Sequence, residues 1–194
     1  GRIYRVVWES TAAMEGKKQF SRALPGDAST EELVSMLAHP NGWHRTTAAR
    51  LLFERNDTAA QPELLSLFRS DARSPGRLLA LYLLASFNQL EFETLKEALE
   101  DNQPRIREHA VRLASKWLGD AANKSNSSTE KLEQWVLART TDPDLHVRYQ
   151  TAFALGEVQE PSHIGALTTI IRRDTDDPYI RAAVLSSLAE GANH

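Results

Sequence analysis

The sequence contains no cysteine. This absence excludes disulfides, thiolate zinc sites, iron–sulfur clusters, cysteine nucleophiles and covalent haem attachment through a CxxCH motif. No apolar run approaches the roughly 20 residues that a membrane-spanning helix requires. The formal net charge is only −3, so the chain has no overall positive field that would gather nucleic acid or an anionic membrane.

The sequence also lacks the usual signatures of catalytic sites. It has no glycine-rich phosphate loop, GxSxG elbow or kinase motif. Its six histidines show no HExxH or HxxxH spacing, and its acidic residues are scattered along the chain. We therefore predict that this chain has no catalytic, cofactor-binding or metal-binding residues and is not itself an enzyme.

What the sequence does contain is an internal repeat. The segments DPDLHVRYQTAFALGEV (142–158) and DDPYIRAAVLSSLAEG (176–191) each combine Asp-Pro, an apolar residue, arginine and an alanine-rich run. Three earlier segments follow the same plan less closely. The repeated arginines are Arg45, Arg77, Arg107, Arg148 and Arg181. Such a recurrence, about every 30–40 residues, indicates stacked helical repeats.

The stretches between these segments carry apolar residues at the spacing of one helical face. Ser29 and Glu32 form a capping-box pattern that marks the first helix start. The pattern predicts an all-α fold, a right-handed α-α superhelix of about five helix pairs between residues 29 and 191. Each pair leaves an apolar face that its neighbours in the stack cover.

The repeated arginines allow two interpretations. They could form a row that binds anions, or each could pair with an aspartate in its own or the next repeat's loop and join neighbouring repeats. An arginine that recurs once per repeat is expected to make a contact that every repeat requires, namely the contact with its neighbour. This regularity favours the structural interpretation. The residues predicted to form this inter-repeat ladder are the five arginines together with Asp101, Asp142 and Asp177.

The tryptophans divide into two kinds. Trp117 and Trp135 follow apolar residues at helical spacing, so we predict that both lie in the core. Trp43 begins a predicted second helix beside His44, near a loop at the edge of the solenoid. Trp43 and His44 are therefore the candidates for contact with a partner.

The repeat motif resembles that of the HEAT-repeat family, including phycobilisome-lyase-like repeats. The match is best at 142–155 and 177–188, partial at 101–114 and loose in the first two pairs. The resemblance implies an armadillo-like helical solenoid that binds proteins, and it implies almost nothing about a specific function.

A second resemblance concerns GRIYRVVW at the start of the sequence and NGWHRTTAARLLFER at 41–55. Both are similar to segments of planctomycete/verrucomicrobial-type membrane-bound dehydrogenases, which combine a β-propeller, HEAT repeats and a CxxCH cytochrome domain. The resemblance implies two domains: residues 1–28, an N-terminal strand and linker that end a preceding propeller, and residues 29–191, the repeats. The strand residues that match are Gly1, Ile3, Tyr4 and Arg5.

From these observations we expect a non-catalytic scaffold or protein-interaction domain that spaces or docks a catalytic propeller and a cytochrome domain. The parent protein would be periplasmic or membrane-associated, and this chain would hold no cofactor. A free-standing HEAT-repeat adaptor is the alternative. A HEAT-like DNA glycosylase is disfavoured by the negative charge. The expected partner is a protein or a neighbouring domain, with no nucleic acid and no membrane insertion.

Overall fold

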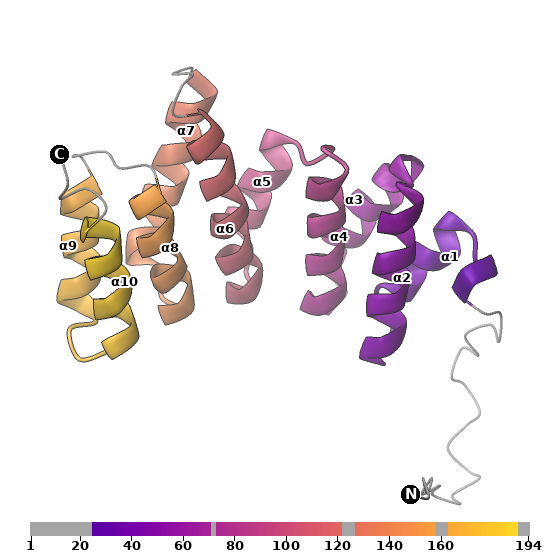
Figure 1. Ribbon diagram of the computed structural model, residues 1–194, viewed down its shortest axis with the longest axis horizontal. Coiled ribbons are helices and arrows are strands. Elements are labelled where there is room, and N and C mark those ends of the chain that lie inside the picture. The colour runs from indigo at the N-terminus through magenta and orange to yellow at the C-terminus, as the bar shows by residue number, and fades with distance from the viewer. Residues whose placement is uncertain (1–24, 71–72, 122–126, 158–162, 190–194) are drawn as a thin grey trace, which may run out of the picture.

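The computed structural model describes residues 25–70, 73–121, 127–157 and 163–189, and within these ranges the fold is entirely helical (Figure 1). The helices are α1 (Thr30–Met36), α2 (Gly42–Arg55), α3 (Gln61–Arg69), α4 (Ser74–Ser86), α5 (Phe92–Leu99), α6 (Pro104–Ala121), α7 (Ser127–Leu137), α8 (Leu145–Glu157), α9 (His163–Arg173) and α10 (Pro178–Ala189), with short 3-10 turns at η2 (Pro25–Asp27), η3 (Thr58–Ala60) and η4 (Ala138–Thr141).

The helices form five consecutive pairs that stand side by side in a row (Figure 1). The even-numbered helices make one layer, in which each contacts the next even-numbered helix, and the odd-numbered helices make the other. The predicted α-α solenoid of helix pairs is confirmed. The predicted N-terminal strand, with Gly1, Ile3, Tyr4 and Arg5, lies outside the described residues.

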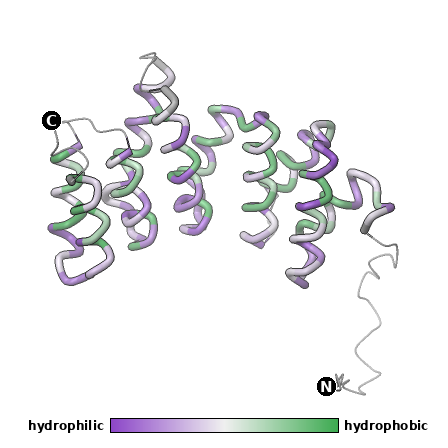
Figure 2. The backbone as a smooth tube through the Cα atoms, viewed as in Figure 1, coloured by the Kyte–Doolittle hydropathy of each residue, from purple (hydrophilic) through white to green (hydrophobic). Residues whose placement is uncertain are grey.

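A single apolar core runs between the two layers. Apolar and polar residues alternate along each helix, as expected where one helical face is buried (Figure 2). Trp117 and Trp135 pack against this core but are only partly buried. The Trp135 ring lies against the Phe92 ring at a tilt of 41°, with centroids 4.7 Å apart, and the Lys96 ammonium lies 5.3 Å from the centre of the Trp135 ring. These two tryptophans therefore cover the edge of the core.

The helix ends follow local sequence signals in most places. The capping box of Ser29 and Glu32 is present at the start of α1. Asn56 ends α2 in the left-handed region, with φ 49°. Gly119 lies inside α6, which continues to Ala121. The neighbouring buried Leu118 anchors this last turn, and tertiary packing outweighs the roughly 1 kcal/mol that a helical glycine costs. None of the described helices is long and apolar enough to cross a membrane.

Helices α8 and α10 approach each other closely at Gly156. A Cβ atom at this position would lie 2.5 Å from the Ser187 Oγ and 2.8 Å from its Cα. The Ser187 hydroxyl also bridges the helices, donating to the Ala152 carbonyl at 2.8 Å. The junction between the last two pairs therefore requires a residue without a side chain here.

We expect Gly156→Ala to lower the free energy of unfolding by about 1–3 kcal/mol, because the Ser187 backbone must move to admit a methyl group. Urea denaturation measures the change. Gly165→Ala in α9 is the matched control, since open space surrounds Gly165, and it should raise the stability by up to about 1 kcal/mol. Equal effects of the two substitutions would contradict the close approach.

Candidate functional site

Four of the five repeated arginines share one intramolecular contact. In each of these four the Nη1 atom donates to the backbone carbonyl six residues earlier, in the turn that precedes the helix. The pairs are Arg45 with His39 at 2.7 Å, Arg107 with Asp101 at 2.8 Å, Arg148 with Asp142 at 2.6 Å, and Arg181 with Thr175 at 3.3 Å. The contact fixes each guanidinium at the start of its own helix and leaves its other nitrogens free for a second partner.

In Arg107 and Arg148 that second partner is an aspartate in the turn of the next helix pair. The Arg107 Nε and Nη2 donate to the Asp142 carboxylate at 2.8 and 2.7 Å. Arg148 binds Asp174 in the same two-pronged way, at 2.7 and 2.6 Å. Two-pronged arginine–carboxylate pairs fix orientation as well as distance. These pairs join α6 to the turn after η4, and α8 to the turn after α9.

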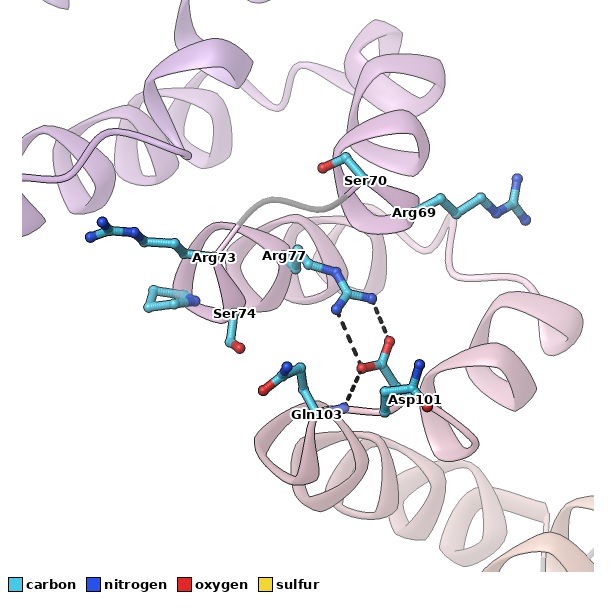
Figure 3. Close-up of a pocket in the computed structure, with 9 residues that line it drawn as sticks. Arg69, Ser70, Arg73, Ser74, Arg77, Asp101 and Gln103 are labelled. Carbon is cyan, nitrogen blue, oxygen red and sulfur yellow. Dashed lines mark hydrogen bonds and ion pairs between the residues drawn. The ribbon is translucent and has the colours of Figure 1, made fainter.

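Arg77 makes the equivalent pair earlier in the solenoid. Its guanidinium binds both oxygens of Asp101 (Figure 3). Its Nε donates to the Phe68 carbonyl at 2.7 Å. The backbone carbonyls of Asp101 and Asp142 also accept hydrogen bonds, from Arg107 and Arg148 respectively. The hydrogen bonds therefore form an unbroken series through four helix pairs. The residues of this series, here called the ladder, are Arg77, Asp101, Arg107, Asp142, Arg148 and Asp174.

Asp177 differs from its predicted role. Arg148 pairs with Asp174 rather than Asp177, whose Oδ1 accepts from the Tyr179 and Ile180 backbone amides at 2.9 Å and caps α10. The prediction aligned Asp177 with Asp142 because each precedes a proline. In the structure the aspartate that caps a helix, such as Asp177, lies four residues before the arginine of that helix. The aspartate that pairs with the arginine of the preceding helix pair lies six residues before it, as Asp142 does, or seven, as Asp174 does. Asp174 therefore takes the place in the ladder that the sequence assigned to Asp177.

Asp142 is the most enclosed carboxylate of the ladder. Besides Arg107, it has the Arg139 guanidinium 3.7 Å away and accepts from the Asp144 amide at 3.0 Å. Burial on its own would raise the pKa of Asp142, but the hydrogen bonds from Arg107 and the Asp144 amide and the charge of both arginines hold it below its ordinary value. The bond with Asp142 in turn raises the pKa of Arg107.

This arrangement predicts how stability depends on pH. Because the pKa of Asp142 is lower in the folded chain than in the unfolded one, its ionised form stabilises the fold at neutral pH, and the gain is lost as the pH falls below about 4 and through the folded pKa. The cost of Asp142→Asn, measured by urea unfolding, should therefore be largest at pH 7 and shrink toward pH 3. A cost that stays constant over this range would contradict the prediction.

A polar cavity of about 610 Å³ lies between the start of α4 and the turn before α6 (Figure 3). Two of the arginines that line this cavity are already paired with carboxylates. Arg77 pairs with Asp101, and Arg69 pairs with Glu97 at 2.9 and 3.0 Å. Asp101 also accepts from the Gln103 amide at 2.8 Å. The ladder arginine in this cavity thus serves the inter-repeat contact, in keeping with the structural interpretation, and is not a free anion-binding group.

The second predicted site, Trp43 and His44, lies at the start of α2. Trp43 is 59% exposed, and its amide is capped by the Asn41 side chain at 3.0 Å. The Trp43 ring meets the His44 ring edge-on, with centroids 5.0 Å apart, and His44 lies against His39 at 4.3 Å. The buried His44 Nδ1 has no hydrogen-bond partner among the described residues. The structure thus presents an aromatic cluster at this edge.

Two further histidines, His109 and His163, make contacts between helices. His109 meets the Tyr82 hydroxyl at 2.8 Å, and burial lowers the pKa of His109. His163 lies 2.7 Å from Glu133 and 3.2 Å from the Leu155 carbonyl. Within the described ranges, no three side chains of the histidine, aspartate or glutamate type converge to hold a metal ion.

Several other large apolar side chains are exposed at positions that sequence reasoning did not single out. These are Phe53 on α2, Ile164 on α9, and Tyr179, Leu185 and Leu188 on α10. Leu185 and Leu188 stand 33 residues after Ala152 and Leu155, which are buried in α8. Only the position of α10 at the end of the described row separates these two leucines from their buried counterparts, and periodicity does not carry that information.

Comparison with known proteins identifies the fold. A family profile described as HEAT repeats matches residues 132–191, which include most of the last two helix pairs. A solved structure of the CpcE–CpcF complex of phycocyanin lyase from Nostoc sp. PCC7120 is similar, with a TM-score of 0.63 and 18% identity over 82% of this chain and 97% of that chain.

Two further structures share the arrangement. One, solved in work on microtubule plus-end tracking by XMAP215, CLIP-170 and EB1, has a TM-score of 0.51 and 18% identity over 84% of this chain and 73% of that one. An engineered protein has a TM-score of 0.53 and 15% identity over 84% and 79%. No curated protein matches the sequence significantly. At these identities the likenesses establish a HEAT-repeat type of solenoid.

Proposed function

We propose that this chain is a non-catalytic scaffold that binds a protein partner through the edge around Trp43. The observation that carries the proposal is the exposure of a tryptophan on a helix held in place by its neighbours. Large aromatic side chains, tryptophan above all, dominate the binding energy of protein interfaces when a partner covers them.

The chemistry of the remaining residues supports a binding role. The ladder arginines and aspartates are bound to one another, so they are engaged in holding the repeats rather than in reacting with a substrate. The similar structures were solved in the study of a lyase complex and of microtubule end tracking, which lends support by analogy to a role in assembly with other proteins.

The test is to place a photo-crosslinking residue at position 43 in the full chain and irradiate extracts of the cells from which the protein comes. One protein should be captured at position 43 and not at Gln134, an exposed control position on α7. Trp43→Ala should then weaken binding of that purified protein by at least about tenfold, with an unchanged melting temperature. Capture that is equal at both positions would overturn the proposal.

A finer form of the proposal places the scaffold in a membrane-bound dehydrogenase, between a catalytic propeller and a cytochrome domain. Its support is the resemblance of residues 1–6 and 41–55 to that family, with residues 1–28 as the end of the propeller and 29–191 as the repeats. The coding sequence on either side provides the test. A propeller before this segment and a CxxCH motif after it are the expected result. Their absence would favour a free-standing adaptor.

The DNA glycosylase alternative makes a different prediction. Such an enzyme would bind duplex DNA at micromolar protein with an affinity that falls steeply with salt. The scaffold proposal predicts no such binding, because the net charge is −3 and Arg77, Arg107 and Arg148 already hold carboxylates. Fluorescence anisotropy with a labelled duplex at two salt concentrations distinguishes the two.

A further inference from the structure

Equivalent positions on the even-numbered helices, the layer that stands in front in Figure 1, form a row of exposed or half-buried side chains. The members of this row, here called the front row, are the residues five positions after each repeated arginine: Arg50, Tyr82, Arg112, Phe153 and Ser186. Basic and aromatic residues alternate over its first four positions. Because stacked repeats place equivalent residues next to one another, this alternation runs across the layer from one helix to the next.

The contacts in the middle of the layer set the distance between members of the front row. Helix α6 packs against both α4 and α8. The Tyr82 hydroxyl meets His109 of α6 at 2.8 Å, and burial raises the pKa of Tyr82 while the neighbouring Arg112 guanidinium opposes this rise. Packed helices lie about 8–10 Å apart, and an extended chain advances about 3.3 Å per residue. One step along the front row is therefore about as long as three residues of an extended segment.

Arg112 carries the positive charge of the front row that is not yet paired. Its side chain is exposed, and within the described ranges no carboxylate forms an ion pair with it. Glu108, one turn earlier on α6, pairs instead with Arg105 at 2.7 Å. Arg50, the other cation of the front row, lies 3.7 Å from the Glu54 carboxylate. A carboxylate brought by a partner would therefore be attracted to Arg112.

Half-buried aromatic residues flank Arg112 on both neighbouring helices. On α4, the Tyr82 ring meets the His109 ring edge-on, with centroids 5.5 Å apart. On α8, the Phe153 ring meets the Tyr149 ring in the same way at 5.0 Å. Both Tyr82 and Phe153 pack against the core, so they are held in place before a partner arrives and lose little freedom on binding. Arginine and tyrosine are also among the residues that contribute most to interface affinity.

We propose that the middle of the front row binds an extended acidic segment of a partner protein. One aspartate or glutamate of the segment pairs with Arg112, and the side chains three residues before and after it are apolar and pack on Tyr82 and Phe153. The proposal gives the chemistry of a partner for the scaffold and so rests on the function proposed above. It uses α4, α6 and α8 in the interior of the described row of helices, whereas Trp43 belongs to the first pair.

Single-stranded nucleic acid is the other ligand that alternating basic and aromatic side chains can bind. The charges around the front row favour a protein segment. Glu54, Glu108 and Glu157 lie on the accessible side of the same helices, and a continuous phosphate backbone would have to pass close to them. An isolated carboxylate between apolar side chains needs only one unpaired cation, which Arg112 supplies.

Differential peptide display tests the proposal. A library of random 12-residue peptides is selected in parallel on the full chain and on its Arg112→Gln variant. We expect the peptides retained only by the parent chain to share an aspartate or glutamate with apolar residues three positions before and after it. Recovery of the same peptides by both proteins, of no peptides by the parent chain, or of parent-specific peptides without that spacing would overturn the proposal.

A labelled peptide of the selected sequence then tests the ion pair by fluorescence anisotropy. Arg112→Gln should weaken binding by at least about tenfold, with an unchanged melting temperature. Arg172→Gln, at an exposed arginine of α9 in the other layer, should leave the affinity unchanged. Arg112→Glu should prefer a peptide in which lysine replaces the acidic residue.

Equal losses for the Arg112 and Arg172 variants, no preference of Arg112→Glu for the lysine peptide, or tighter binding of a single-stranded oligonucleotide than of the acidic peptide would overturn the proposal. The two proposals fail separately. Absence of a crosslink at position 43 would overturn only the Trp43 proposal, and failure of the peptide selection would overturn only the acidic-segment proposal.

Discussion

Replacing Arg148 with alanine should lower the free energy of unfolding by about 3–5 kcal/mol, the usual cost of removing one partner from a buried ion pair. The substitution leaves the Asp174 carboxylate without its two donors and the Asp142 carbonyl without its 2.6 Å hydrogen bond. The bonds with Asp174 also raise the pKa of Arg148, so the lost charge is a stabilised one. Urea denaturation at pH 7 measures the change.

Two further variants make this result specific. Arg69→Ala removes a pair of similar geometry with Glu97, but both side chains are about half exposed, so the cost should be only about 0–1 kcal/mol. Arg148→Lys keeps the charge but not the two-pronged geometry, and should recover only part of the stability. A cost for Arg148→Ala as small as that for Arg69→Ala would contradict the role of the ladder.

Phe68→Ala should also cost about 3–5 kcal/mol, for a different reason. Phe68 is a fully buried side chain of α3, and the Arg77 guanidinium lies 5.4 Å from its ring. Truncation opens a cavity in the core and removes the aromatic face beneath a ladder arginine. Thermal unfolding measures the loss.

Phe68→Leu is the control for that prediction. It keeps most of the apolar volume and should cost less than about 1.5 kcal/mol. Similar costs for the alanine and leucine variants would mean that the ring contact with Arg77, rather than the filled volume, sets the stability at this position.

The sequence predicted the solenoid because its strongest signals are local and repeated. Apolar spacing and the first capping box depend on residues within one or two helical turns, and the structure keeps both. The predicted number of helix pairs follows from the recurrence of arginine. These patterns can be read without knowledge of long-range contacts, which is why one sequence was enough to predict the solenoid.

The error at Asp177 has an equally physical origin. Aspartate serves two purposes in these turns, as a helix cap and as the acceptor for an arginine of the preceding pair. The two positions differ by only two or three residues, and the turn before α10 is one residue longer before its arginine than the turn before α8. Asp-Pro looks the same in both turns, so only the contacts themselves distinguish the cap from the ladder residue.

The exposed face of α10 lies beyond what periodicity can indicate. Leu185 and Leu188 occupy positions that are buried in α8, and a repeat pattern predicts that they are buried too. Their exposure depends on which segment, if any, lies next in the stack. The same holds for Trp117 and Trp135. Their spacing predicted correctly that they face the core, but it did not predict that they are only partly buried.

The most direct test of the account is a pair of double-mutant cycles at the junction between the fourth and fifth helix pairs. Arg148→Ala is combined with Asp174→Ala in one cycle and with Asp177→Ala in the other, and urea denaturation gives the coupling energies. The account predicts a coupling of about 1.5–3 kcal/mol between Arg148 and Asp174, and additive effects for Arg148 and Asp177. Additive effects of Arg148 and Asp174, or an equal coupling in both cycles, would contradict it.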